Sequence, residues 1–207
     1  MARDGGKFAG TIHLLATKGI SVISDIDDTI KVSDVLNRDE LMKNTLVRPF
    51  QPVKGMADPY RAWATNNGAS FHYVSGSPWQ LYPALAEFVR SNNFPTGSFH
   101  WKQFRVKEEA FLNLFKDPEV YKMAIIEPLF ERFPERRFIL VGDSGERDPE
   151  IYGMLARKHP GQVQRIIIRD VTGQAPEPAR YRKAFAGISP HVWKVFDDPA
   201  ELPLQLP

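Results

Sequence analysis

The segment Ser24-Asp25-Ile26-Asp27-Asp28-Thr29-Ile30-Lys31 places three carboxylates directly after an apolar, β-branched run at residues 19–23, which predicts a buried strand. In open α/β sheets, ligands bind at the edge formed by the C-terminal ends of the strands. Like charges packed this closely repel, so the carboxylates need a cation or a proton to coexist. Mg²⁺ suits such a cluster, because it takes oxygen ligands from one or two carboxylates and from substrate phosphates. The alternative is a solvated acidic turn without chemistry.

The size and composition of the chain narrow the class of protein. Its 207 residues suffice for one domain with a real core or for two small domains. The net charge of +2 gives no strong attraction to nucleic acid, and the absence of cysteine excludes disulfides and thiolate metal sites. No apolar run approaches the roughly 18 residues of a membrane span. The N-terminus has no apolar core typical of a signal peptide, and we expect residues 1–18 to be an extension or a boundary inside a longer protein.

Strand and helix signals alternate along the chain. We predict strands at residues 19–25, 69–74, 97–102, 137–141, 164–170 and 191–196. Helices are predicted at residues 38–43, 55–67, 79–91, 107–133, 148–158 and 180–185, the fourth of them interrupted at Asp117-Pro118, where Pro118 would open a second piece. Such alternation favours a mostly parallel sheet that helices cover on both faces. The continuously apolar character of the runs at 137–141 and 165–168 agrees with burial on both sides.

Three of the predicted strands end in polar residues. These ends are Asp25-Ile26-Asp27-Asp28-Thr29, Ser75-Gly76-Ser77 and Gly142-Asp143-Ser144-Gly145-Glu146-Arg147-Asp148. In a parallel sheet all three point to the same edge, where ligands bind. Their convergence is more specific than any one of them alone.

On these strings the chain resembles the phosphatases of the haloacid dehalogenase (HAD) superfamily, whose signature is DxDx[TV], a Ser or Thr after the second strand, a later Lys and an acidic GD motif. More narrowly, it resembles the catalytic domain of the App1-like (DUF2183-like) phosphatidate phosphatases. The longer strings that carry this likeness lie at residues 24–31, 71–82, 97–100 and 141–152. The resemblance implies a three-layer α/β/α Rossmann-like HAD fold with a mostly parallel central sheet and a minimal cap, forming one catalytic domain over residues 19–207.

The acidic residues then have distinct expected roles. Asp25 is the expected nucleophile, forming an aspartyl-phosphate. Asp27 would protonate the leaving group and then activate the hydrolytic water. Asp25 and Asp143 are the expected Mg²⁺ ligands, and the resemblance adds the backbone carbonyl of Asp27. Asp148 would support the metal directly or through water, and it could also be a helix N-cap. Asp28 is left with a supporting or structural role.

The remaining expected site residues would hold the phosphoryl group. Ser75 offers a hydroxyl after the second strand, and Gly76 would allow close approach of the backbone. Thr29 belongs to the expected substrate-binding set. A lysine must neutralise the nucleophile and the phosphoryl charge, and the resemblance favours Lys122, with Lys107 as the rival.

The gaps between these motifs are too short for a full cap domain, so we expect an open site that suits a large substrate. The expected activity is that of a Mg²⁺-dependent phosphomonoesterase, and the resemblance favours phosphatidate, converted to diacylglycerol at a membrane surface. Four aromatic residues could form an apolar wall for a lipid tail, although aromatics at such spacing are more often core: Trp79, Tyr82, Phe99 and Trp101. The alternatives are a phosphatase of a soluble nucleotide, sugar or protein phosphoester, and a non-catalytic binding module. We expect a cytoplasmic protein, peripheral at membranes, without a nucleic-acid partner.

Overall fold

A parallel sheet organises the computed structural model, which describes residues 10–102, 118–173 and 179–207. Within these ranges six strands lie in the order β5-β4-β1-β6-β7-β8, and every neighbouring pair is parallel. The strands are β1 (Gly19–Asp25), β4 (Ser70–Pro78), β5 (Gly97–Lys102), β6 (Arg136–Asp143), β7 (Val163–Arg169) and β8 (Trp193–Phe196). The mostly parallel sheet predicted from the sequence is therefore confirmed.

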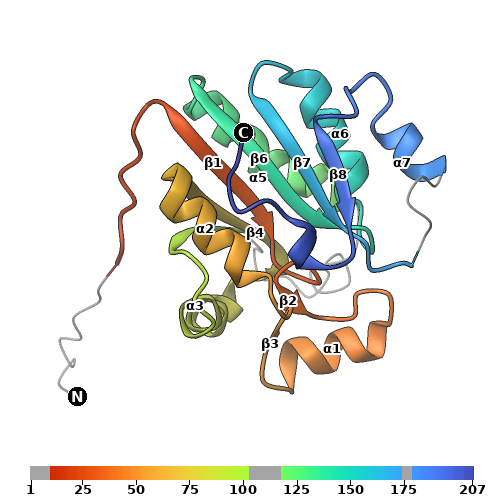
Figure 1. Cartoon of the computed structure of the whole chain (residues 1–207). Helices are drawn as coiled ribbons and strands as arrows, with labels where there is room; N and C mark the ends of the chain where they lie inside the picture. Colours follow the sequence, from red (N-terminus) through yellow and green to blue (C-terminus); the bar gives the residue numbers. More distant parts are fainter. Residues whose placement is uncertain (1–9, 103–117, 174–178) are drawn as a thin grey trace.

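Helices cover both faces of this sheet (Figure 1). They are α2 (Ala57–Asn67), α3 (Tyr82–Ser91), α5 (Pro118–Arg132), α6 (Asp148–Lys158) and α7 (Ala179–Ala184), with short 3-10 turns η1 (Trp79–Leu81) and η3 (Pro199–Glu201). Two hydrophobic cores result, one beneath α2 and α3 and the other beneath α5, α6 and α7. None of the described helices is both long and apolar enough to cross a membrane.

Neighbouring residues of the central strands contribute to different cores. Val22 packs in the first core and Ile23 in the second, and Ile139 and Leu140 alternate in the same way. This follows from the pleat, which turns successive side chains to opposite faces of a strand. A sheet buried on both faces needs apolar residues at every position, which explains the continuous apolar runs of the sequence.

Strand β4 is longer than predicted. The expected strand at 69–74 begins one residue later and continues to Pro78, because β5 supplies a partner along this length. The register shifts between the pairs Ser75↔Trp101 and Pro78↔Lys102, which marks a bulge beside the predicted phosphate-binding serine. The predicted helix at 79–91 accordingly starts as η1 and becomes α-helical only at Tyr82.

A small excursion separates the first two motifs. It consists of β2 (Lys31–Val32), α1 (Arg38–Leu46) and β3 (Gln51–Pro52), and β2 and β3 pair as antiparallel strands. It lies at the end of the sheet toward which β1 and β6 point (Figure 1). No residue of α1 is buried, and Asn37 caps the helix through the backbone N–H groups of Asp39 and Glu40. Between Asp25 and Ser75 there is thus no full cap domain, as predicted.

The predicted helix at 107–133 is described only in part, because its residues 107–117 lie outside the described residues.

Gly153 on α6 offers a test of how closely α6 and α7 pack. A Cβ at Gly153 would overlap the backbone carbonyl oxygen of Ala184, whereas a Cβ at Gly161 would meet no atom. Alanine normally stabilises a helix interior by about 1 kcal/mol relative to glycine. We expect Gly153→Ala to lower the free energy of unfolding by about 1–3 kcal/mol instead, because the two backbones must separate.

Urea denaturation followed by circular dichroism measures this change. Gly161→Ala is the matched control and should stay within about 0.5 kcal/mol of the wild type. A stabilised Gly153→Ala variant would show that the packing of α6 on α7 is looser than described.

Candidate active site

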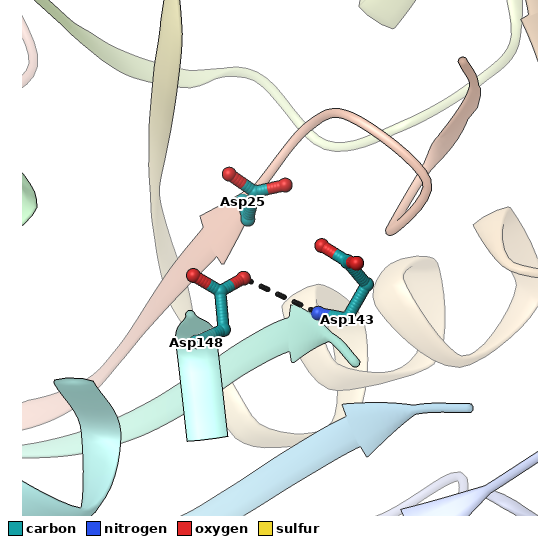
Figure 2. Close-up of side chains that lie close together, drawn as sticks. All are labelled: Asp25, Asp143 and Asp148. Carbon is teal, nitrogen blue, oxygen red and sulfur yellow. Dashed lines mark hydrogen bonds between the residues drawn. The ribbon is translucent and has the colours of Figure 1, made fainter. Parts of the chain in front are cut away.

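The carboxyl ends of β1 and β6 bring three buried aspartates together. Asp25 is the last residue of β1, Asp143 is the last residue of β6, and Asp148 is the first residue of α6. One carboxylate oxygen from each lies within 4.8 Å of the other two. Figure 2 shows the three side chains converging from these separate elements. The convergence of strand ends predicted from the sequence is confirmed for these residues.

Backbone features of the β6–α6 loop position two of these carboxylates. Asp148 accepts a hydrogen bond from the backbone N–H of Asp143 at 3.2 Å (Figure 2). A Cβ at Gly142 would overlap the Asp148 carboxylate, so this glycine leaves the room that Asp148 occupies. Asp143 Oδ1 accepts from the backbone N–H groups of Gly145 at 2.6 Å and Glu146 at 3.1 Å. Arg147 is the N-cap of α6, so the N-cap alternative for Asp148 was wrong.

The donor set fits a hard divalent cation. Asp143 Oδ2 is buried and has no hydrogen-bond partner, although a buried acceptor without a partner is costly. Three carboxylate oxygens at close range are the kind of ligand that Mg²⁺ takes, leaving further positions for water or substrate. Asp25, Asp143 and Asp148 would hold such an ion by their side chains.

Lys122 supplies the positive charge of the site. Its side chain is fully buried on α5, and its Nζ lies 2.8 Å from Asp25 Oδ1, 2.8 Å from Glu146 Oε2 and 2.5 Å from Asp148 Oδ1. Burial alone would lower the pKa of Lys122, but the carboxylates of Asp148, Asp25 and Glu146 outweigh it and raise the pKa well above its usual value. Lys122, which the resemblance favoured, therefore lies in contact with the expected nucleophile, and its role stays a prediction. Lys107 lies outside the described residues.

The carboxylates of this cluster hold protons more tightly than isolated ones. Burial raises the pKa of Asp25 well above its usual value; the charge of Lys122 opposes this shift, and the carboxylates of Asp148, Glu146 and Asp143 add to it. Burial likewise raises the pKa of Asp143 well above the usual value and that of Asp148 more moderately. Four carboxylates face one ammonium here, so a divalent cation would relieve the excess negative charge.

Asp27 belongs to a second polar cluster. Its Oδ1 lies 2.9 Å from Lys31 Nζ and accepts from Ser33 Oγ at 2.7 Å, while its Oδ2 accepts from Ser75 Oγ at 3.1 Å and Ser77 Oγ at 3.4 Å. Burial favours a raised pKa for Asp27, but the charge of Lys31 and the hydrogen bonds from Lys31, Ser33 and Ser75 outweigh it and lower the pKa. The side chain of Asp27 lies outside the three-aspartate group, and its backbone carbonyl as a metal ligand stays a prediction.

The loop after Asp25 is held by its own side chains. Asp28 has a left-handed backbone (φ 51°), and its carboxylate accepts from the backbone N–H groups of Ser33, Asp34 and Val35 at 2.6–2.9 Å. This agrees with the structural role expected for Asp28. Thr29 donates to Asp25 Oδ2 at 3.3 Å, so it contacts the expected nucleophile.

Gly76 lies against Tyr121. A Cβ at this position would overlap the Tyr121 hydroxyl, and Tyr121 precedes Lys122 on α5. The glycine therefore lets α5 approach the end of β4. Its contact with substrate stays a prediction.

Several residues of the site were missed in the sequence. Glu146 pairs with Lys122, and Lys31 and Ser33 hold Asp27. Arg180 on α7 donates to the backbone carbonyls of Ser144 and Glu146 and so ties down the loop between β6 and α6. Asp27 and Lys31 are four residues apart, but that spacing predicts a charge pair only on a helix, and here it spans the turn that leads from β1 into β2. Nothing in the sequence pointed to Arg180.

The four aromatic residues expected near the site do gather in space. Together they line a cavity of about 370 Å³. Phe99 and Trp101 stack with centroids 5.5 Å apart and pack against the core, while Trp79 and Tyr82 are 55% and 47% exposed. Phe99 and Trp101 are therefore partly buried against the core, whereas Trp79 and Tyr82 present apolar surface to solvent.

Comparisons with known proteins place this chain in a family. Residues 20–170 match the family described as "Phosphatidate phosphatase APP1, catalytic domain", and the chain belongs to that family. Phosphatidate phosphatase APP1 of Saccharomyces cerevisiae is 35% identical over 154 residues, which are 73% of this chain and 26% of that protein. An uncharacterized protein of Schizosaccharomyces pombe is 33% identical over 168 residues, or 79% of this chain and 27% of that protein. The chain thus spans about a quarter of the length of these relatives, and no solved structure matches it.

The mutual repulsion of the aspartates predicts that one of them destabilises the metal-free fold. We expect Asp143→Asn to raise the free energy of unfolding by about 1 kcal/mol or more at neutral pH, because it removes a carboxylate whose charge is disfavoured by burial and by the neighbouring acids. For a chain of this size the melting temperature should rise by about 2–4 °C per kcal/mol. Thermal denaturation in EDTA measures the change, and Asp58→Asn on the exposed surface is the control.

The pH dependence follows from the same shifts. The pKa values of Asp25, Asp143 and Asp148 are raised by folding, so the folded state binds more protons than the unfolded chain. The stability of the metal-free protein should therefore increase as the pH falls from neutral toward about 4. Asp143→Asn should flatten this increase. A wild type whose metal-free stability rises with pH over this range would contradict the repulsion.

Proposed function

We propose that the chain is the catalytic domain of a Mg²⁺-dependent phosphomonoesterase of the HAD type. The observation that carries the proposal is the position of Asp25. Its carboxylate contacts Lys122 at 2.8 Å and lies in one cluster with the carboxylates of Asp143 and Asp148. A carboxylate nucleophile, a lysine and a divalent-metal site are the parts that phosphoryl transfer through a phospho-enzyme requires. The parallel sheet and the family membership support this assignment.

In the proposed reaction an oxygen of Asp25 attacks phosphorus and displaces the substrate's alcohol oxygen. Asp27 gives a proton to that oxygen, and the products of this step are the free alcohol and an aspartyl-phosphate on Asp25. Asp27 then takes a proton from the water that cleaves the aspartyl-phosphate, which releases inorganic phosphate. The lowered pKa of Asp27 keeps its carboxylate ionised, which is the form that the second step needs. The first step needs the protonated form, which the negative charge of a bound phosphoryl group would favour.

Polar groups around Asp25 would hold the phosphoryl oxygens. Lys122 neutralises the charge of the nucleophile and of the group under attack. Ser75 stands at the end of β4 with its hydroxyl 3.1 Å from Asp27, so it could bind a phosphoryl oxygen beside the acid/base residue. Thr29 contacts Asp25 and would orient its carboxylate.

Mg²⁺ bound by Asp25, Asp143 and Asp148 would screen the repulsion between an anionic nucleophile and an anionic ester. The pKa values of these carboxylates are raised without the metal, and metal binding would lower them. Mg²⁺ binding should therefore release protons.

Phosphatidate is the substrate that we propose, with diacylglycerol as the product. One relative bears the name of phosphatidate phosphatase. Only short elements lie between Asp25 and Ser75, so no domain inserted there covers the site. A substrate embedded in a membrane requires such an uncovered site. The half-exposed Trp79 and Tyr82 add apolar surface just beyond the end of β4.

Release of inorganic phosphate in the presence of Mg²⁺ tests the reaction class. The wild type should hydrolyse at least one member of a panel of phosphate esters. The rate of phosphate release by Asp25→Asn should be lower by at least about 10³-fold, because the nucleophile is removed. Asp27→Asn should lose about 10²–10⁴-fold, the usual contribution of a general acid/base. EDTA should abolish turnover. An active Asp25→Asn variant would exclude the covalent route.

The substrate class is tested by comparing phosphatidate in mixed micelles with soluble phosphoesters. We expect a higher kcat/KM for phosphatidate, because its apolar tails add binding that soluble esters lack. Trp79→Ala should raise KM for phosphatidate by a few-fold through the lost apolar contact and leave soluble esters unchanged. Faster turnover of a nucleotide or sugar phosphate would favour the soluble-ester alternative instead.

A further inference from the structure

A second buried lysine, Lys31, lies beside the reaction centre and has no part in the reaction steps proposed above. Lys31 is fully buried on β2, and its Nζ contacts Asp27 Oδ1 at 2.9 Å and the hydroxyl of Ser33. Its Nζ also lies 5.1 Å from the centre of the Phe50 ring. Taking a lysine out of water is costly unless it is paired, so this side chain needs Asp27 as its partner.

The backbone around Lys31 holds that partnership in place. The Lys31 N–H donates to Ile26 O at 3.0 Å, and the Asp28 N–H donates to Lys31 O at 2.7 Å, which closes the loop on itself. Pairing of Lys31 with Pro52 joins the loop to β3. Because Asp27 and Lys31 lie within one closed loop, the direction from Nζ to the carboxylate is set by the backbone.

The two oxygens of Asp27 have separate sets of partners. Oδ1 contacts Lys31 and Ser33, which lie on the excursion, whereas Oδ2 contacts Ser75 and Ser77, which lie at the end of β4. The contacts of Oδ1 are the shorter ones, at 2.9 and 2.7 Å against 3.1 and 3.4 Å. Lys31 and Ser33 therefore set the rotation of the carboxylate and leave Oδ2 toward the serines.

We propose that Lys31 is a positioning residue for proton transfer: with Ser33 it holds Asp27 so that Oδ2 faces the leaving oxygen of a substrate bound at Ser75. This inference rests on the proposed function and extends it to a residue that does not touch the substrate. The competing explanation is that the pair of Lys31 and Asp27 only stabilises the fold. The two explanations differ in which substrates are hydrolysed more slowly when Lys31 is replaced.

The leaving group separates the two explanations. An alkoxide leaves poorly and depends on a proton from Asp27, whereas p-nitrophenolate leaves readily without one. Loss of positioning should therefore slow an alkyl ester much more than an aryl ester. Loss of general structure should slow both by the same factor.

The experiment compares Lys31→Met, Ser33→Ala and the control Lys158→Met, all with Mg²⁺. Lys158 lies at the end of α6 away from the site, where it is exposed and also paired with a carboxylate, Glu127. The aryl substrate is p-nitrophenyl phosphate, and the alkyl substrate is dioctanoyl phosphatidate, or glycerol 3-phosphate if the wild type accepts only soluble esters. We expect Lys31→Met to lose at least about 10-fold more kcat on the alkyl ester than on the aryl ester, within the range of general acid catalysis.

Ser33→Ala should show the same imbalance at a smaller size, and Lys158→Met should show no loss. In the Asp27→Asn background Lys31→Met should add no further imbalance, because the group that it positions is already removed. Equal losses on both esters would overturn the proposal. If Lys31→Met fails to fold by circular dichroism, Ser33→Ala decides by the same comparison. A wild type inactive on all three esters refutes the proposed function itself, whereas an active wild type with equal losses refutes only the role of Lys31.

Discussion

The ion pairs of Lys122 are the interaction on which the rest of the site depends. An ammonium on α5 holds carboxylates from β1, from the β6–α6 loop and from the start of α6 within 2.8 Å. Buried charges are tolerated only when they are paired, and removing one partner of such a pair typically costs about 3–5 kcal/mol. Lys122 thereby couples the packing of α5 to the geometry of the reaction centre. The first turn of α6 adds to this, because the helix N-terminus favours the negative charge of Asp148.

The two aspartates of the DxD segment differ in the direction of their pKa shifts, because Asp25 pairs with Lys122 and Asp27 pairs with Lys31. Asp25 shares Lys122 with Glu146 and Asp148, so burial and repulsion raise its pKa. Asp27 has Lys31 to itself together with serine hydroxyls, and its pKa is lowered. Environments that push the pKa values of two neighbouring carboxyl groups apart suit them to different tasks. The proposed first step needs the opposite order, an ionised Asp25 and a protonated Asp27, so a cation at Asp25 and the negative charge of a substrate beside Asp27 would have to shift both pKa values.

The loops that carry these groups are fixed by contacts remote from the reacting atoms. Asp28 binds three backbone N–H groups of the loop that follows it, and its carbonyl accepts from Arg169 on β7 at 2.6 Å. Arg180 binds the carbonyls of the β6–α6 loop and pairs with Glu150 at 2.8 Å. Catalytic side chains need supporting contacts of this kind to hold a productive geometry. The two hydrophobic cores on either side of the sheet supply the stability that offsets the repulsion among the aspartates.

The sequence by itself determined the types of the main helices and strands, the parallel sheet and the edge at which the polar groups gather, but not the short strands β2 and β3. The bounds predicted for β5 and α6 are those of the structure, because Gly97, Asp148 and Pro149 are strong local signals. Family resemblance and position in the chain singled out Lys122. Tertiary structure alone decided that β4 extends past Val74, that Asp27 belongs to a cluster apart from Asp143 and Asp148, and that Glu146 shares Lys122. Hydrophobic periodicity records which face of an element is buried, but which loop side chains meet depends on how separate elements pack, and no local pattern records that.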